Sequence, residues 1–207
     1  DANRTNYLIL ANTTGTFTDP TNGNAPPADD LDLSDGSGAI SLGAAATSQA
    51  WSTGLSASTV YHFKIYARNS AGNLYLTAAA PSASRTTLAA VPTQQPSGLS
   101  LSAISDTQIN GSFTAPGSPP TSYIVLRRIG AFTGSDDPVG GTGYSAGNTI
   151  GAATVVDVIN HPTVAFNATG LAASTSYNFR VYSFNGSGAT ANYLLTSPLA
   201  GTQSTFA

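Results

Sequence analysis

The sequence predicts an all-β protein, and three observations lead to this fold class. The straight-chain residues that favour helices are nearly absent, because the 207 residues include no Glu, no Met and a single Lys. Apolar and polar residues alternate with a period of two in residues 61–66 and 177–182, as they do in strands with one buried face. Turn-forming Gly, Ser, Asn and Pro lie between such segments, as in residues 115–120 and 185–188.

The composition excludes several functional classes. Charged residues make up 8% of the chain, against roughly 25% in an average soluble domain. Seven Lys and Arg residues are too few for a basic patch, so we expect no nucleic-acid partner. No apolar run approaches the ~18 residues of a membrane span, and a chain without Cys cannot form thiolate zinc sites. The lack of Cys suits an extracellular or cell-surface protein whose sparsely charged surface carries hydroxyls or sugars, or is covered by other copies.

An internal repeat divides the chain. Residues 53–69 recur as residues 169–185, at an offset of 116, and the same offset pairs residues 7–10 with residues 123–126. Two copies of one domain are therefore expected, with loops that differ between them. The predicted domains are residues 1–90 and residues 91–207.

Each copy divides into short expected strands. In the second copy, the alternation at residues 177–182 predicts a strand. The first copy keeps counterparts of the central strands, around residues 7–10 and at residues 61–66.

Both copies contain the pattern Leu-x-x-x-Thr-x-Tyr-x-Phe-x-Val/Ile-Tyr-x-x-Asn, which ends at Asn69 and at Asn185. This pattern resembles the E–F corner and F strand of fibronectin type III domains, and the resemblance covers nearly the whole chain. It implies two immunoglobulin-like β-sandwiches in tandem. In the second copy, the segments that resemble strands A, B, C and G of the family are residues 96–101, 108–116, 121–128 and 192–196. The resemblance also implies that Tyr61 and Tyr177 are corner tyrosines, whose hydroxyls hydrogen-bond to the backbone just upstream. Residues 141–148 are similar to repeats of secreted bacterial surface proteins.

The first copy has no counterpart of the leading strands, which the family calls A and B. These strands occupy about residues 93–116 of the second copy, so the offset of 116 places their counterparts before residue 1. A sandwich that lacks them exposes a hydrophobic groove and an unpaired sheet edge, which is a template for strand addition. We expect this assembly groove at Tyr7, Ile9, Trp51 and Phe63.

Two explanations for the incomplete first copy stay open at this point. The chain is either a piece of a longer protein, beside neighbouring modules, or a subunit completed by a strand from another copy, which gives a head-to-tail filament. The candidate donors are residues 199–207 and a segment at the N-terminus. The expected function is that of a non-enzymatic extracellular structural protein, a subunit of a surface fibre. The alternative is an adhesive or carbohydrate-binding spacer within a larger secreted protein, with glycans as partners.

Candidate sites for ions or catalysis are few. Asp30, Asp32 and Asp35 lie in one acidic segment and offer oxygen ligands of the kind that Ca²⁺ prefers, although their spacing does not fit an EF-hand loop. A plain solvated turn is the alternative. The two histidines, His62 and His161, stand in no recognisable Ser–His–Asp arrangement. We therefore expect no enzymatic activity, and no cofactor apart from this calcium ion.

Overall fold

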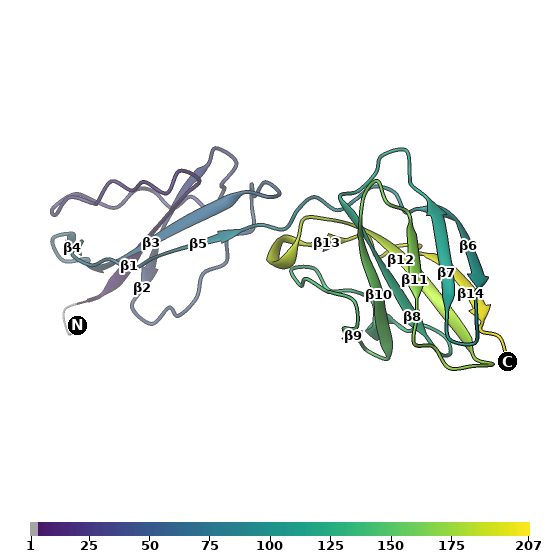
Figure 1. The fold of residues 1–207 in the computed structure, drawn as a ribbon. Helices are drawn as coiled ribbons and strands as arrows, with labels where there is room; N and C mark the ends of the chain where they lie inside the picture. Colours follow the sequence, from purple (N-terminus) through teal and green to yellow (C-terminus); the bar gives the residue numbers. More distant parts are fainter. Residues whose placement is uncertain (1–3) are drawn as a thin grey trace. The chain divides into compact units, whose positions relative to one another are not determined.

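The computed structural model describes residues 4–207 and divides into two compact units, Asp1–Thr87 and Leu88–Ala207. The division lies three residues before the expected boundary between residues 90 and 91. Regular structure in the described range consists of strands and two short 3-10 helices, η1 (Gly134–Asp136) and η2 (Gly188–Thr190) (Figure 1). The predicted all-β fold class is thereby confirmed. None of these helices is long and apolar enough to span a membrane.

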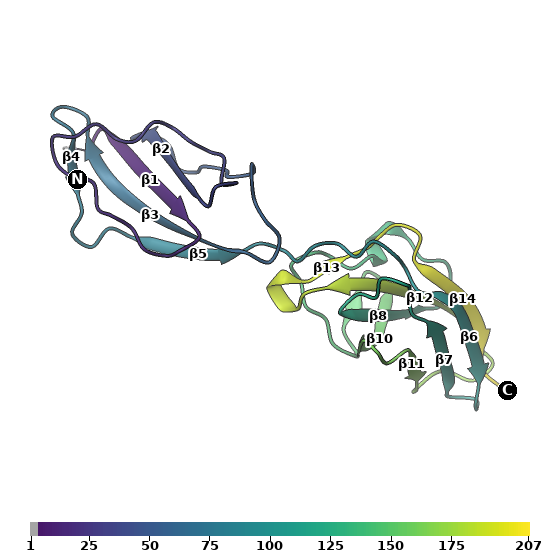
Figure 2. The same ribbon diagram turned by 90° about the horizontal axis from the view of Figure 1, so that it is seen from above.

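The second unit is a sandwich of two antiparallel sheets. One sheet has the strand order β11-β7-β6, and the other has the order β13-β12-β8-β10-β9, with β14 paired to β12 (Figure 2). The strands are β6 (Ser97–Ala103), β7 (Ile109–Thr114), β8 (Ser122–Arg128), β9 (Thr149–Ile150), β10 (Ala153–Asn160), β11 (Ala165–Ala168), β12 (Ser176–Asn185), β13 (Asn192–Tyr193) and β14 (Leu199–Ser204).

The main core of the second unit lies between its two sheets. Strand β7 contributes Ile109 and Phe113, and the larger sheet contributes Tyr123, Val125 and Phe179. All five side chains are buried, because alternate residues of a strand point to the same face and here meet the facing sheet. The opposite face of the larger sheet is covered by a second apolar cluster that includes Ile124, Leu126, Tyr182 and Tyr193.

The first unit contains one antiparallel sheet of order β2-β1-β3-β4, with β5 paired to β3. Within residues 4–87 the structure describes no second sheet. The register repeats that of the second unit, because Ile9 of β1 pairs with Ile65 of β3 just as Val125 of β8 pairs with Val181 of β12. The strands are β1 (Asn6–Asn12), β2 (Ser37–Gly43), β3 (Val60–Asn69), β4 (Leu74–Leu76) and β5 (Ser82–Thr86).

The two units differ at the counterpart of β11. The offset of 116 assigns this position to residues 49–52, which form no strand. In the second unit β11 pairs with β7 alone, and the described part of the first unit holds no counterpart of β7. A strand at residues 49–52 would therefore have no ladder to join.

The C-terminal segment is already part of the second unit. Leu199–Ser204 is β14, whose residues pair with Val181 through Ser176 of β12. Thr205 is also buried, and its hydroxyl donates a hydrogen bond of 2.7 Å to the carbonyl of Ala172. Of the two candidate donors, residues 199–207 are therefore disfavoured, because most of this segment closes its own sheet.

Candidate functional site

The first unit has an apolar groove on one face of its sheet. Tyr7 and Ile9 of β1 and Phe63 and Ile65 of β3 form its floor, since residues two apart along a strand point to the same side. The groove has a volume of about 640 Å³. Its other lining residues are Leu42, Ala46, Thr47, Ser48, Gln49, Trp51 and Pro81, so no charged side chain faces it.

The same positions in the second unit lie in the core. The counterparts of the floor residues face the three-stranded sheet and are 0–1% exposed, whereas the floor residues themselves are only half-buried. The difference therefore arises from the missing cover and not from the residues of the floor. The pairs related by the offset of 116 are Tyr7 and Tyr123, Ile9 and Val125, Phe63 and Phe179, and Ile65 and Val181.

Trp51 forms one wall of the groove. Its ring lies 6.0 Å from that of Phe63, measured between centroids, and the two planes are inclined by 55°. A Cβ atom on Gly38 of β2 would lie 2.6 Å from the Trp51 ring, so the indole packs directly over this glycine. Residues 47–52 make no backbone–backbone hydrogen bond with any residue in the range 4–207. One wall of the groove is thus irregular backbone outside any ladder, in which the Ala50 carbonyl accepts a hydrogen bond of 2.7 Å from the Gln49 side chain.

The corner tyrosines hold the start of β3 and of β12 in the same way. The Tyr61 hydroxyl accepts a hydrogen bond of 2.9 Å from the backbone N–H of Ser56. The Tyr177 hydroxyl accepts an equivalent bond of 2.9 Å from the N–H of Ala172. Both tyrosines are buried. This contact fixes the direction in which β3 enters its sheet and so places Phe63 on the groove floor.

The opposite face of the first sheet is covered. Leu8 and Tyr66 are 0% exposed there, and Asp19 accepts hydrogen bonds of 2.7 Å from both the Tyr66 hydroxyl and the Lys64 ammonium. The bond from Lys64, and then that from Tyr66, lowers the pKa of Asp19. Burial, and then the bond to Asp19, raises the pKa of Tyr66. The second unit repeats this contact with Asp137, Tyr182 and Arg180.

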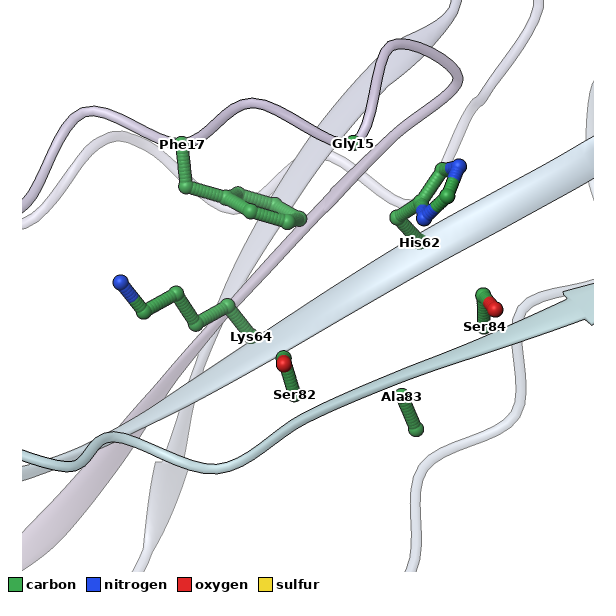
Figure 3. A pocket seen from close by; sticks show the side chains of 7 residues that line it. All are labelled: Gly15, Phe17, His62, Lys64, Ser82, Ala83 and Ser84. Atoms are coloured by element: carbon green, nitrogen blue, oxygen red, sulfur yellow. The ribbon is translucent and has the colours of Figure 1, made fainter.

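A smaller pocket of about 380 Å³ lies on this covered face of the first unit. Figure 3 shows Phe17 from the loop after β1, His62 and Lys64 from β3, and Ser82 and Ser84 from β5 around it. A Cβ atom on Gly15 would lie 3.1 Å from the His62 ring, so this glycine lets the loop pass close to the imidazole. The pocket combines an aromatic ring with hydroxyl groups and one ammonium, which is already paired with Asp19.

The acidic segment does not gather its carboxylates. Asp30 Oδ1 accepts a hydrogen bond from the N–H of Asp32, and Asp32 Oδ1 accepts one from the N–H of Ser34. Asp35 Oδ1 likewise accepts bonds from the N–H and the hydroxyl of Ser37. Each carboxylate thus supports its own turn. Among residues 4–207, no group of three or more His, Cys, Asp or Glu residues could hold a metal ion. The calcium site stays a prediction that this geometry does not support.

Two features escaped the sequence analysis. Ile65 belongs to the groove floor, and its place two residues after Phe63 in an alternating strand was a sufficient signal. Residues 143–147 read Gly-x-Ser-x-Gly, the pattern of a nucleophile elbow. The structure places the exposed Ser145 in a turn, where its N–H donates to the side chain of Asn148, and not between a strand and a helix. The segment therefore lacks the strand–turn–helix setting of a nucleophile elbow.

Comparisons with known proteins agree with this architecture. The FN1–FN3 domains of chicken CNTN1 match 98% of this chain and 55% of their own length, with 15% identity and a TM-score of 0.50. The chain therefore spans little more than half of that structure, and the likeness concerns the fold. A segment of two fibronectin type III domains from chicken tenascin matches 97% of this chain and 84% of its own length, with 17% identity and a TM-score of 0.36.

No curated protein sequence matches the chain. The family model for the fibronectin type III domain matches residues 94–194. These residues include both sheets of the second unit up to β13. The resemblance to fibronectin type III domains is thereby confirmed for residues 94–194, just under half of the chain.

Proposed function

We propose that the chain is a non-enzymatic structural module of an extracellular fibre or filament, in which strands from another subunit complete the first unit. Fibronectin type III domains share their sandwich architecture with many cell-surface domains. The observation that carries the proposal is the open groove, whose floor residues Tyr7, Ile9, Phe63 and Ile65 match core residues of the second unit. A sandwich core of this kind normally lies between two sheets.

The energetics favour a cover over this face. Full burial of one Phe or Ile side chain contributes about 1.5–3 kcal/mol, and the three floor residues of these types, Ile9, Phe63 and Ile65, are only half-buried, as is Tyr7. An added strand would also pair with the backbone of residues 47–52, which makes no hydrogen bond to other backbone groups within residues 4–207, and main-chain hydrogen bonds are the usual source of affinity in strand addition. A contact of this type joins two different surfaces, so its repetition builds an open fibre unless the rotation closes a ring.

The experiment is negative-stain microscopy and sedimentation of the native protein, isolated without denaturant. We expect regular fibres or high-mass assemblies. An Ile9→Asp variant places a charge on the groove floor and is expected to abolish assembly, whereas Ile129→Asp is the matched control, because Ile129 is 64% exposed and lies in the second unit. Circular dichroism checks that both variants fold. Native protein that stays monomeric at high concentration, with a folded first unit, overturns the proposal.

The second candidate function is a carbohydrate-binding spacer, which the pocket of Figure 3 favours. Phe17 offers a ring for stacking against a sugar, and Ser82 and Ser84 offer hydroxyl groups beside it. Binding to a glycan array that is lost in Phe17→Ser would support this candidate. Phe206→Ser is the control, because Phe206 is 54% exposed and lies in the second unit. Equal glycan binding by both variants, or none by the parent chain, would count against it.

A further inference from the structure

We propose that the completing strand carries an aliphatic residue, a glycine and an aromatic residue at alternate positions, the pattern that β7 has in the second unit. This inference rests on the proposed function, because it names the chemistry of the strand that fills the groove. Strand β7 reads Ile-Asn-Gly-Ser-Phe-Thr from Ile109 to Thr114, and Ile109, Gly111 and Phe113 are its buried positions. Each position can be matched to a feature of the open groove.

The aromatic position corresponds to Tyr7. In the second unit Phe113 packs edge-on against Tyr123, with 4.8 Å between ring centroids and an angle of 69°. Tyr7 occupies the same register position on β1 as Tyr123 does on β8. An aromatic residue of the incoming strand would therefore meet the Tyr7 ring in the edge-to-face arrangement that aromatic pairs prefer.

The glycine position corresponds to Trp51. Gly111 pairs directly with Phe166 of β11, and a Cβ atom on this glycine would lie 2.1 Å from the Phe166 ring. Phe166 in turn packs on Phe179, at 5.8 Å between centroids. Trp51 packs in the same manner on Phe63, the counterpart of Phe179, at 6.0 Å. A strand that pairs beside Trp51 therefore needs a glycine beneath the indole. Other sheets use the same pairing of an aromatic residue with a glycine on the neighbouring strand.

Two further features fit this occupant. The offset of 116 assigns the position of Phe166 to residue 50, and Trp51 stands one residue later. Residues 47–52 can accommodate this shift of one residue because they are not held in a ladder. The lining of the groove is uncharged, so the strand face that enters it must be apolar. The intervening residues would face solvent and be polar, as Asn110 and Ser112 are in β7.

The experiment titrates the full chain, diluted until sedimentation shows monomers whose groove is empty, with a peptide of residues 106–116, which contains β7. Trp51 is the only tryptophan of the chain, so its fluorescence reports on the groove and stays silent if the peptide binds to the second unit. We expect a saturable shift of the emission to shorter wavelength as the indole leaves water. A Gly111→Val peptide should bind at least about tenfold more weakly, because the added side chain would collide with the indole.

Two controls make the outcome decisive. A peptide with Ile109→Ser and Phe113→Ser keeps the backbone but lacks the apolar side chains, and should give no saturable shift. The Ile9→Asp chain should not bind the parent peptide. Equal binding by the parent and Gly111→Val peptides, or no binding by the parent peptide, overturns this inference. Fibres that form although the peptide does not bind leave the filament proposal standing, whereas monomeric native protein that binds the peptide overturns only the filament proposal.

Discussion

The two units share their central strands but differ in what covers them. Strands β1 and β3 have the same register as β8 and β12, and the corner bonds of Tyr61 and Tyr177 have the same length of 2.9 Å. Yet Phe63 is half-buried and its counterpart Phe179 is 1% exposed. The geometry of a strand pair and its corner is thus set by local sequence, whereas burial is set by the second sheet.

The largest expected effect comes from truncating the shared phenylalanine in each unit. Phe179→Ala should lower the free energy of unfolding of the second unit by about 3–5 kcal/mol, because the side chain is fully enclosed. Phe63→Ala should cost the first unit less than about 2 kcal/mol, because this ring still contacts solvent. Urea unfolding measures both. Trp51 fluorescence reports on the first unit, and the second unit is followed by the transition in tyrosine ellipticity that Trp51 does not share, because both units contain tyrosines.

Equal losses of unfolding free energy in Phe63→Ala and Phe179→Ala would contradict this difference between the units. In that case the first unit buries Phe63 as deeply as the second unit buries Phe179, and its open face does not exist in solution. The comparison sharpens if the loss for Phe63→Ala rises in assembled native protein, because a completing strand would then enclose the ring.

A smaller effect, confined to the second unit, comes from acid. Asp136 is 0% exposed, and it is the only carboxylate that is buried within residues 4–207. Burial opposes its charge, but hydrogen bonds from the N–H groups of Thr133 and Ala152, the Thr133 hydroxyl and Arg128 outweigh this and lower its pKa to about 2. A depressed pKa stabilises the fold above the unfolded value of 3.8, and this contribution disappears as the pH falls through 2.

The second unit should therefore lose about 2 kcal/mol between pH 4 and pH 2 through this group. Urea unfolding at a series of pH values measures the loss. Asp136→Asn should remove most of the pH dependence and lower stability at neutral pH, whereas the exposed Asp106→Asn is the control and should leave both unchanged. An acid loss of the same size in Asp136→Asn would contradict this assignment.

The next effect should be equal in the two units. Tyr61→Phe and Tyr177→Phe each remove one hydroxyl that accepts a backbone hydrogen bond, from Ser56 and Ala172 respectively. Each change should lower the free energy of unfolding of its own unit by about 1 kcal/mol, the usual contribution of one such bond. Unequal losses, measured by the same urea transitions, would show that the corner depends on the second sheet and not on local sequence alone.

The sequence was sufficient where local pattern determines structure. Tyr61, Tyr177 and Phe63 could be placed because strand alternation and the offset of 116 act within a few residues. The place of residues 199–204 could not be read in this way, because an alternating apolar segment suits an edge strand of its own sheet as well as a donor strand. The wall formed by Trp51 was only partly foreseeable, since its position depends on a loop whose length differs between the copies.

Contacts between a loop and a strand were also beyond sequence reasoning. Asp19 meets Tyr66 across 47 residues, and Asp137 meets Tyr182 across 45. The two aspartates are therefore 118 residues apart, although the strands repeat at 116. The different loop lengths hide the correspondence, and only the folded sheet brings each carboxylate to its tyrosine.

The smallest expected effect comes from these two aspartates. Asp137 has a side-chain exposure of 28% and Asp19 one of 48%, so solvent screens the ion pair with Lys64 more than that with Arg180. Asp137→Asn should destabilise its unit more than Asp19→Asn does, and both losses should shrink in high salt. Urea transitions at low and high ionic strength measure this, and a larger loss for Asp19→Asn would mean that the covered face of the first unit is more enclosed than that of the second. This face is covered in both units. Nearly equal losses for Asp19→Asn and Asp137→Asn would therefore leave the open groove as the feature that distinguishes the two units.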